Sequence, residues 1–69
     1  MAETNEADPH HHTRKMEERF HETVAHLRRD VSVIEDPRAR ALFETAAEVI
    51  TGLEKAFRDY DAKTERAWR

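Results

Sequence analysis

The chain of 69 residues contains no cysteine, one glycine and two prolines. Without cysteine it can have no disulfide framework, no thiolate metal site and no cysteine nucleophile. The scarcity of glycine and proline argues against the many short turns of a β-sandwich or a β-barrel. These absences favour an all-α fold made of long helices.

The charged residues are of both signs, with 12 Lys and Arg against 15 Asp and Glu, giving a net charge of −3. This balance gives little attraction to nucleic acid or to an anionic membrane surface. No apolar run approaches the length of a transmembrane helix, and residues 1–8 carry acids where a secretory signal has basic and apolar residues. We therefore expect a cytoplasmic protein with no nucleic-acid or membrane partner.

Two copies of the dipeptide Asp-Pro mark two helix starts, at Asp8-Pro9 and at Asp36-Pro37. Aspartate is a strong N-cap residue, and proline is favoured at the first helical position, where its missing N–H costs nothing. Because a residue before proline is kept out of the α region, Asp36 also predicts the end of the helix that precedes it.

These signals divide the chain into a disordered acidic tail, residues 1–8, and a single helical domain, residues 9–69. We predict one helix over about 9–34 and a second over about 37–67. The connection between them is so short that the helices should run antiparallel. The alternative is one long helix kinked at Pro37.

The apolar residues of the two helices differ in arrangement. The first helix has one narrow row with heptad spacing, made of Phe20, Val24, Leu27, Val31 and Ile34. The second helix has three rows, made of Ala46, Leu53, Tyr60 and Ala67, of Leu42, Val49 and Ala56, and of Phe43, Ile50 and Phe57. We expect the first helix to cover the first two rows and to leave the third, Phe43, Ile50 and Phe57, facing water.

An uncovered apolar row predicts self-association. Full burial of such side chains stabilises by roughly 1.5–3 kcal/mol each, and oligomerisation is a usual remedy for a small core. We expect a homodimer in which two hairpins form a four-helix bundle, with an interface made of Leu42, Phe43, Val49, Ile50, Leu53 and Phe57. The alternative cover for the row is the N-terminal segment or the chain end around Trp68.

Gly52 lies inside the second predicted helix, where glycine costs about 1 kcal/mol relative to alanine. We interpret it as a tolerated surface position outside the apolar rows. The alternative is that another backbone approaches it closely.

The run His10-His11-His12 is the conspicuous candidate for transition-metal binding, because imidazoles bind Zn, Ni and Cu. Consecutive helical residues point about 100° apart, so three adjacent histidines cannot converge on one ion unless the segment unwinds or two chains share it. The alternatives are a polar run in a frayed helix end or a sequence left over from cloning. His21, with Glu17 four residues before it, offers a possible shared surface site across a dimer.

Glu18 and His21 also form a Glu-x-x-His pair, which resembles the ligand motif of carboxylate-bridged di-iron bundles over four residues. That family requires inward-facing ligands from four helices. Here Glu18 falls on the polar face, and the second helix has no such pair, so a buried dinuclear centre is not expected.

The sequence offers few candidates for catalytic residues, because it has one serine, no cysteine and no glycine-rich phosphate loop. We do not expect an enzyme or a required cofactor. The leading hypothesis is a small non-enzymatic, self-associating module for protein–protein interaction or regulation. The alternative is a protein that binds Zn, Ni or Cu through the histidine run.

Overall fold

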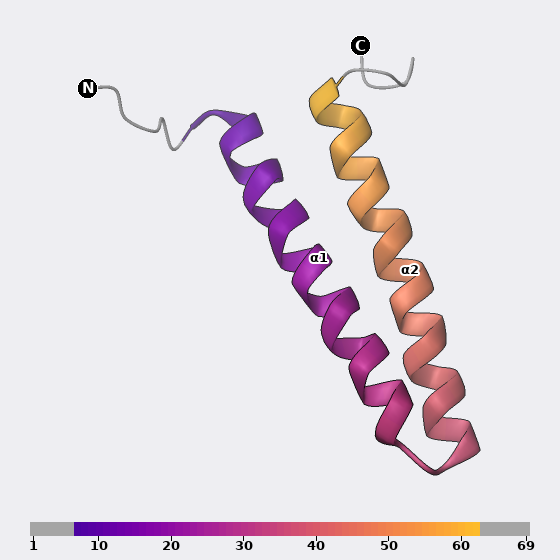
Figure 1. Cartoon of the computed structure of the whole chain (residues 1–69). Helices are drawn as coiled ribbons and strands as arrows, with labels where there is room; N and C mark the ends of the chain where they lie inside the picture. Colours follow the sequence, from indigo (N-terminus) through magenta and orange to yellow (C-terminus); the bar gives the residue numbers. More distant parts are fainter. Residues whose placement is uncertain (1–6, 63–69) are drawn as a thin grey trace.

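The computed structural model describes residues 7–62, which form two helices, α1 (Pro9–Val33) and α2 (Pro37–Ala62). The helices run antiparallel and lie side by side, so that the start of α1 and the end of α2 are at the same end of the hairpin (Figure 1). This confirms the all-α hairpin and overturns the alternative of one long kinked helix. Residues 1–6 of the expected tail and 63–67 of the second helix lie outside the described residues.

Both helices begin at the predicted N-caps. The Asp8 carboxylate accepts a hydrogen bond from the backbone N–H of His10 at 3.1 Å, and Pro9 is the first residue of α1. Asp36 accepts from the backbone N–H of Ala39 at 3.3 Å in the same way. Each carboxylate satisfies an N–H group that has no partner within its helix.

The connection is limited to residues 34–36. The backbone N–H of Ile34 still donates to the carbonyl of Asp30 at 2.9 Å, but Ile34 itself is extended, with φ −75° and ψ 131°. Pro37 then starts α2 and keeps Asp36 out of the helical region. The chain reverses within three residues, which places α1 and α2 against each other.

The helices meet along two rows with alternating spacings of three and four residues, which we call the inner seam. On α2 the inner seam consists of Phe43, Ala47, Ile50, Glu54, Phe57 and Asp61. On the other side it consists of His10, Thr13, Glu17, Phe20, Val24, Leu27 and Val31 of α1, and of Ile34, which caps the end of α1. The rings of Phe20 and Phe57 are in contact across it, with centroids 5.3 Å apart. Ala47 is the one residue of 7–62 that is fully buried.

The prediction of which row of α2 faces α1 was wrong. Phe43, Ile50 and Phe57 are half-buried on the α1 side, whereas Leu42 and Val49 are exposed. The reason is size and shape: a phenylalanine ring buries more apolar area than an alanine or valine, and two rings meeting edge to face add a favourable contact. The bulkiest row therefore fills the space between the helices, and a different apolar row is left outside.

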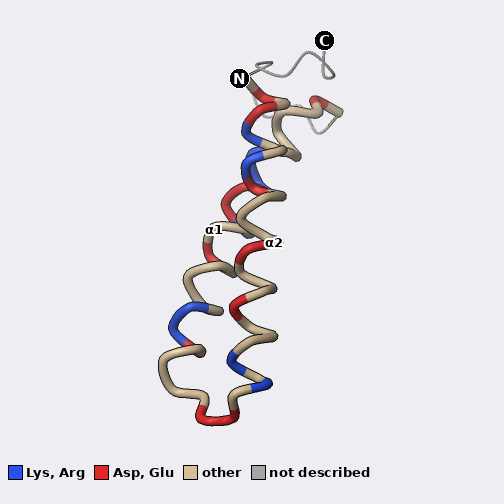
Figure 2. Tube along the Cα trace, turned by 90° about the vertical axis from the view of Figure 1, so that its right-hand side faces the viewer, with Lys and Arg blue, Asp and Glu red and all other residues tan. Residues whose placement is uncertain are grey.

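Neither α1 nor α2 combines the length and apolar content needed to cross a lipid bilayer. Basic and acidic residues are interspersed along the two helices rather than gathered by sign (Figure 2).

Candidate interaction surface

An apolar row runs along the outside of α2, and we call it the outer seam. It consists of Leu42, Ala46, Val49, Leu53, Ala56 and Tyr60, with spacings of 4, 3, 4, 3 and 4 residues. Leu42 is 65% exposed, Val49 58% and Leu53 43%. This spacing is that of a helix that packs against another helix by knobs into holes, but α1 occupies the neighbouring inner seam instead.

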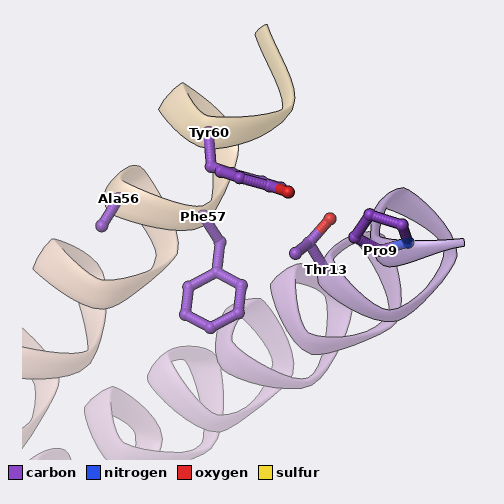
Figure 3. Close-up of a pocket in the computed structure, with 5 residues that line it drawn as sticks. All are labelled: Pro9, Thr13, Ala56, Phe57 and Tyr60. Carbon is purple, nitrogen blue, oxygen red and sulfur yellow. The ribbon is translucent and has the colours of Figure 1, made fainter. Parts of the chain in front are cut away.

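A pocket of about 250 Å³ lies at one end of the outer seam, between the start of α1 and the end of α2. Its walls are Ala56, Phe57 and Tyr60 of α2 together with Pro9 and Thr13 of α1 (Figure 3). The Tyr60 ring extends from α2 toward the two α1 residues and forms the roof of the pocket in this view. The pocket is therefore an apolar hollow that continues the outer seam onto α1.

Met16 extends the same face along α1. It follows Pro9 by seven residues, which is close to two helical turns, so the two residues lie on one side of α1. Met16 is 36% exposed. The apolar face of the hairpin thus includes a part of α1 beside the pocket.

The other side of the hairpin is charged. A shallow hollow there is lined by Glu17, Glu18, His21, Glu22, Glu54 and Arg58. His21 Nδ1 lies 3.4 Å from Glu54 Oε2, and the Arg58 guanidinium donates to the same oxygen at 3.3 Å. Two faces of unlike chemistry result, and only the apolar one has the composition of a helix-packing surface.

Four polar residues close the inner seam at the end away from the connection, and we call them the polar cluster: His10, Thr13, Glu17 and Asp61. Asp61 Oδ1 lies 2.7 Å from His10 Nδ1 and accepts a short hydrogen bond from the Thr13 hydroxyl. The ring of His10 also lies against Tyr60, with centroids 5.5 Å apart. The polar cluster thus ties the first turns of α1 to the last described turn of α2.

The two acids of the polar cluster share one environment and titrate in opposite directions. Hydrogen bonding to Asp61, followed by burial and by the negative charge of Asp61, raises the pKa of Glu17 above its usual 4.5. Burial alone would raise the pKa of Asp61, but hydrogen bonds from Glu17, Thr13 and His10 outweigh it and lower that pKa to about 2. Glu17 therefore holds a proton more readily than Asp61, and the protonated Glu17 donates a hydrogen bond to the Asp61 carboxylate.

One oxygen of each acid, Glu17 Oε2 and Asp61 Oδ2, is buried without a hydrogen-bond donor when both carboxyls are ionised. A buried acceptor with no donor is destabilising, and two adjacent carboxylates repel each other. The polar cluster joins the two ends of the hairpin, and its contribution to the free energy of unfolding depends on whether Glu17 is protonated.

The histidines predicted as metal ligands are dispersed. His10 contacts Asp61, His21 contacts Glu54, and the rings of His11 and His12 lie edge to face at 5.1 Å. Within residues 7–62 no three His, Asp or Glu side chains are grouped so as to hold a metal ion. Metal binding stays a prediction without support from the geometry.

The six residues predicted as a dimer interface separate into two sets. Leu42, Val49 and Leu53 belong to the exposed outer seam. Phe43, Ile50 and Phe57 belong to the inner seam and are half-buried toward α1. Sequence reasoning therefore identified the apolar arc of α2 but exchanged its inner and outer parts.

No protein-family model, curated protein or solved structure matches the chain. The function is therefore argued from the geometry of the two seams.

Proposed function

We propose that the protein is a small non-enzymatic module that self-associates through the outer seam of α2, so that two hairpins form a four-helix bundle. The observation that carries this proposal is the exposure of Leu42, Val49 and Leu53, at 65%, 58% and 43%, on one heptad-spaced row. A row of this kind is typical of helices that pack against another helix.

The energetics favour a partner over a solitary hairpin. Full burial of a leucine or valine side chain stabilises by about 1.5–3 kcal/mol, so three exposed residues in each of two copies offer several kcal/mol to a dimer. The core of a single hairpin contributes little stability of its own, because Ala47 alone is fully buried among the described residues. Small domains without disulfides or structural metals commonly obtain their stability by oligomerisation.

A second copy is the simplest occupant of the outer seam. Closed two-fold dimers are the commonest assemblies of soluble proteins, and they use the same patch on both copies. The outer seam can be such a patch, because its spacings of 4, 3, 4, 3 and 4 residues read the same in both directions along α2.

Sedimentation equilibrium of the full chain tests the proposal. We expect the wild type to be dimeric at micromolar concentrations and the variant V49E/L53E to be monomeric, because the dimer would bury four unpaired carboxylates. The control is Thr51→Glu, which adds one glutamate per copy, against two in V49E/L53E, at an exposed position on the opposite side of α2. We expect this control to remain dimeric.

Thermal unfolding provides a second measurement in case V49E/L53E fails to fold. The melting temperature of a dimer rises with protein concentration, whereas that of a monomer does not. A wild type that is monomeric at all concentrations, with a constant melting temperature, would overturn the proposal, as would a dimer of unchanged mass in V49E/L53E.

A further inference from the structure

We propose that the two α2 helices of the dimer pair antiparallel about residue 51, and that the pocket at the end of each hairpin receives Leu42 of the second copy. This inference rests on the proposed self-association and adds its orientation, its register and the occupant of the pocket. It follows from the symmetry of the outer seam, from the exposure of Leu42 and from the place of the pocket.

The outer seam is self-complementary when read in reverse. An antiparallel pairing centred on residue 51 brings Val49 opposite Leu53, Ala46 opposite Ala56 and Leu42 opposite Tyr60. The two small residues thus face each other, and each large residue faces another large one. Every layer of the interface is apolar, and the same layer recurs on both sides of the two-fold axis.

The pocket and Leu42 distinguish the two possible orientations. The pocket lies at the Tyr60 end of the outer seam, whereas Leu42, which is 65% exposed, lies at the other end. An antiparallel pairing brings Leu42 of each copy to the pocket of the other. A parallel pairing would place Leu42 against Leu42, away from both pockets.

Gly52 lies beside the centre of this pairing. A glycine inside a helix costs about 1 kcal/mol relative to alanine. Within the hairpin nothing lies within 4 Å of the position that a Cβ would occupy there, so α1 does not require a glycine. A partner helix that crosses at this position would explain the glycine, because the absence of a side chain lets the two backbones approach closely.

The pocket lies where Leu42 of the second copy arrives. Tyr60, which is opposite Leu42 in this register, and Ala56 form the α2 walls of the pocket. At about 250 Å³ the pocket is smaller than the roughly 300–1,000 Å³ that drug-sized ligands occupy, which suits an aliphatic side chain. Leu42 is the most exposed residue of the outer seam and needs such a cover.

Disulfide crosslinking tests the orientation and register, because the wild type has no cysteine. We expect an equimolar mixture of A46C and A56C to give the mixed disulfide on mild oxidation, detected by intact mass. Each variant alone should crosslink poorly, because identical positions lie about 15 Å apart along the axis in this register. A fast A46C homodimer would show parallel pairing and overturn the inference.

Substitution of Leu42 tests the occupant of the pocket. We expect Leu42→Ala to raise the dimer Kd about a hundredfold, since two leucines leave apolar sites and each is worth about a factor of ten or more. The matched control is Val33→Ala at an exposed apolar position of α1 away from the outer seam, which should leave the Kd within about twofold. An unchanged Kd in Leu42→Ala would overturn the assignment of the pocket.

The outcomes separate this inference from the function on which it rests. A monomeric wild type would contradict both. A stable wild-type dimer in which A46C and A56C form no mixed disulfide would leave self-association standing and reject the antiparallel register alone.

Discussion

The rings of Phe20 and Phe57 meet edge to face across the hairpin, with centroids 5.3 Å apart and planes at 75°. This contact joins the middle of α1 to the second half of α2 and sets the rotation of α2 about its own axis. With Phe57 turned to α1, the outer seam is turned to the outside. The orientation of one ring pair thus decides which apolar residues remain for a partner.

The two rings should be energetically coupled. We expect a double-mutant cycle of Phe20→Leu and Phe57→Leu to give a coupling energy of about 0.5–1.5 kcal/mol, because leucine keeps apolar volume but loses the edge-to-face contact. Chemical denaturation monitored by circular dichroism measures the four unfolding free energies.

Phe43→Leu provides the control for this cycle. Phe43 belongs to the same inner seam but lies two heptads, about 21 Å along the axis, from Phe57. Its effect should add to that of Phe20→Leu within about 0.5 kcal/mol. Additivity of the Phe20 and Phe57 substitutions themselves would contradict the edge-to-face contact as a source of stability.

Replacing Glu17 by glutamine should stabilise the protein at neutral pH. The pKa of Glu17 is raised in the folded state, so its contribution to stability is complete below about pH 4.5 and is lost as the pH rises through the folded pKa. Glutamine stays neutral and supplies an N–H donor to Asp61 at every pH. We expect Glu17→Gln to add about 1 kcal/mol at pH 7 and to add little at pH 4, measured by thermal unfolding.

Two variants identify the source of that gain. Glu18→Gln makes the same charge change at an exposed neighbouring position and should change stability by less than about 0.5 kcal/mol. In the background of Asp61→Asn, the substitution Glu17→Gln should stabilise much less, because the charge of the acceptor and the repulsion between two carboxylates are both gone. An equal gain at pH 4 and pH 7 would show that the proton of Glu17 is not responsible.

The N-cap of α2 should contribute measurably to the hairpin. Asp36→Ala removes the acceptor of the Ala39 N–H and should lower the unfolding free energy by about 1 kcal/mol, within a range of about 0.5–2 kcal/mol. Asp36→Asn keeps a side-chain oxygen that caps almost as well. A loss in Asp36→Asn equal to that in Asp36→Ala would indicate that the charge, not the cap, matters.

The helices could be predicted from the sequence because their boundaries depend on local chemistry. The Asp-Pro dipeptides at 8–9 and 36–37 define helix starts through a side-chain cap and a fixed φ, and neither depends on distant residues. The observed α1 (Pro9–Val33) differs from the predicted range by one residue at its end.

The rotation of α2 could not be predicted in the same way. The inner and outer seams of α2 lie side by side and have the same spacings of three and four residues, so periodicity does not say which of them meets α1. The choice depends on the fit of Phe57 against Phe20, which is a tertiary contact between residues far apart in sequence.

The polar cluster was missed because the search for a seam followed apolar residues alone. The spacing of the α1 row continues toward the N-terminus through Glu17, Thr13 and His10 without interruption. Extending the row by position, and not by hydrophobicity, would have placed these residues against α2. Their partner Asp61 likewise continues the row of Phe57 by four residues.

The inner seam changes its chemistry along its length, and this gives its two ends unequal sensitivity to acidity. Next to the connection, the seam residues Leu27, Val31 and Ile34 have side chains that exchange no protons. At the far end, the carboxyl groups of Glu17 and Asp61 lie in the seam with pKa values shifted in opposite directions. Within the seam, a change of acidity therefore acts where the chain enters and leaves the hairpin.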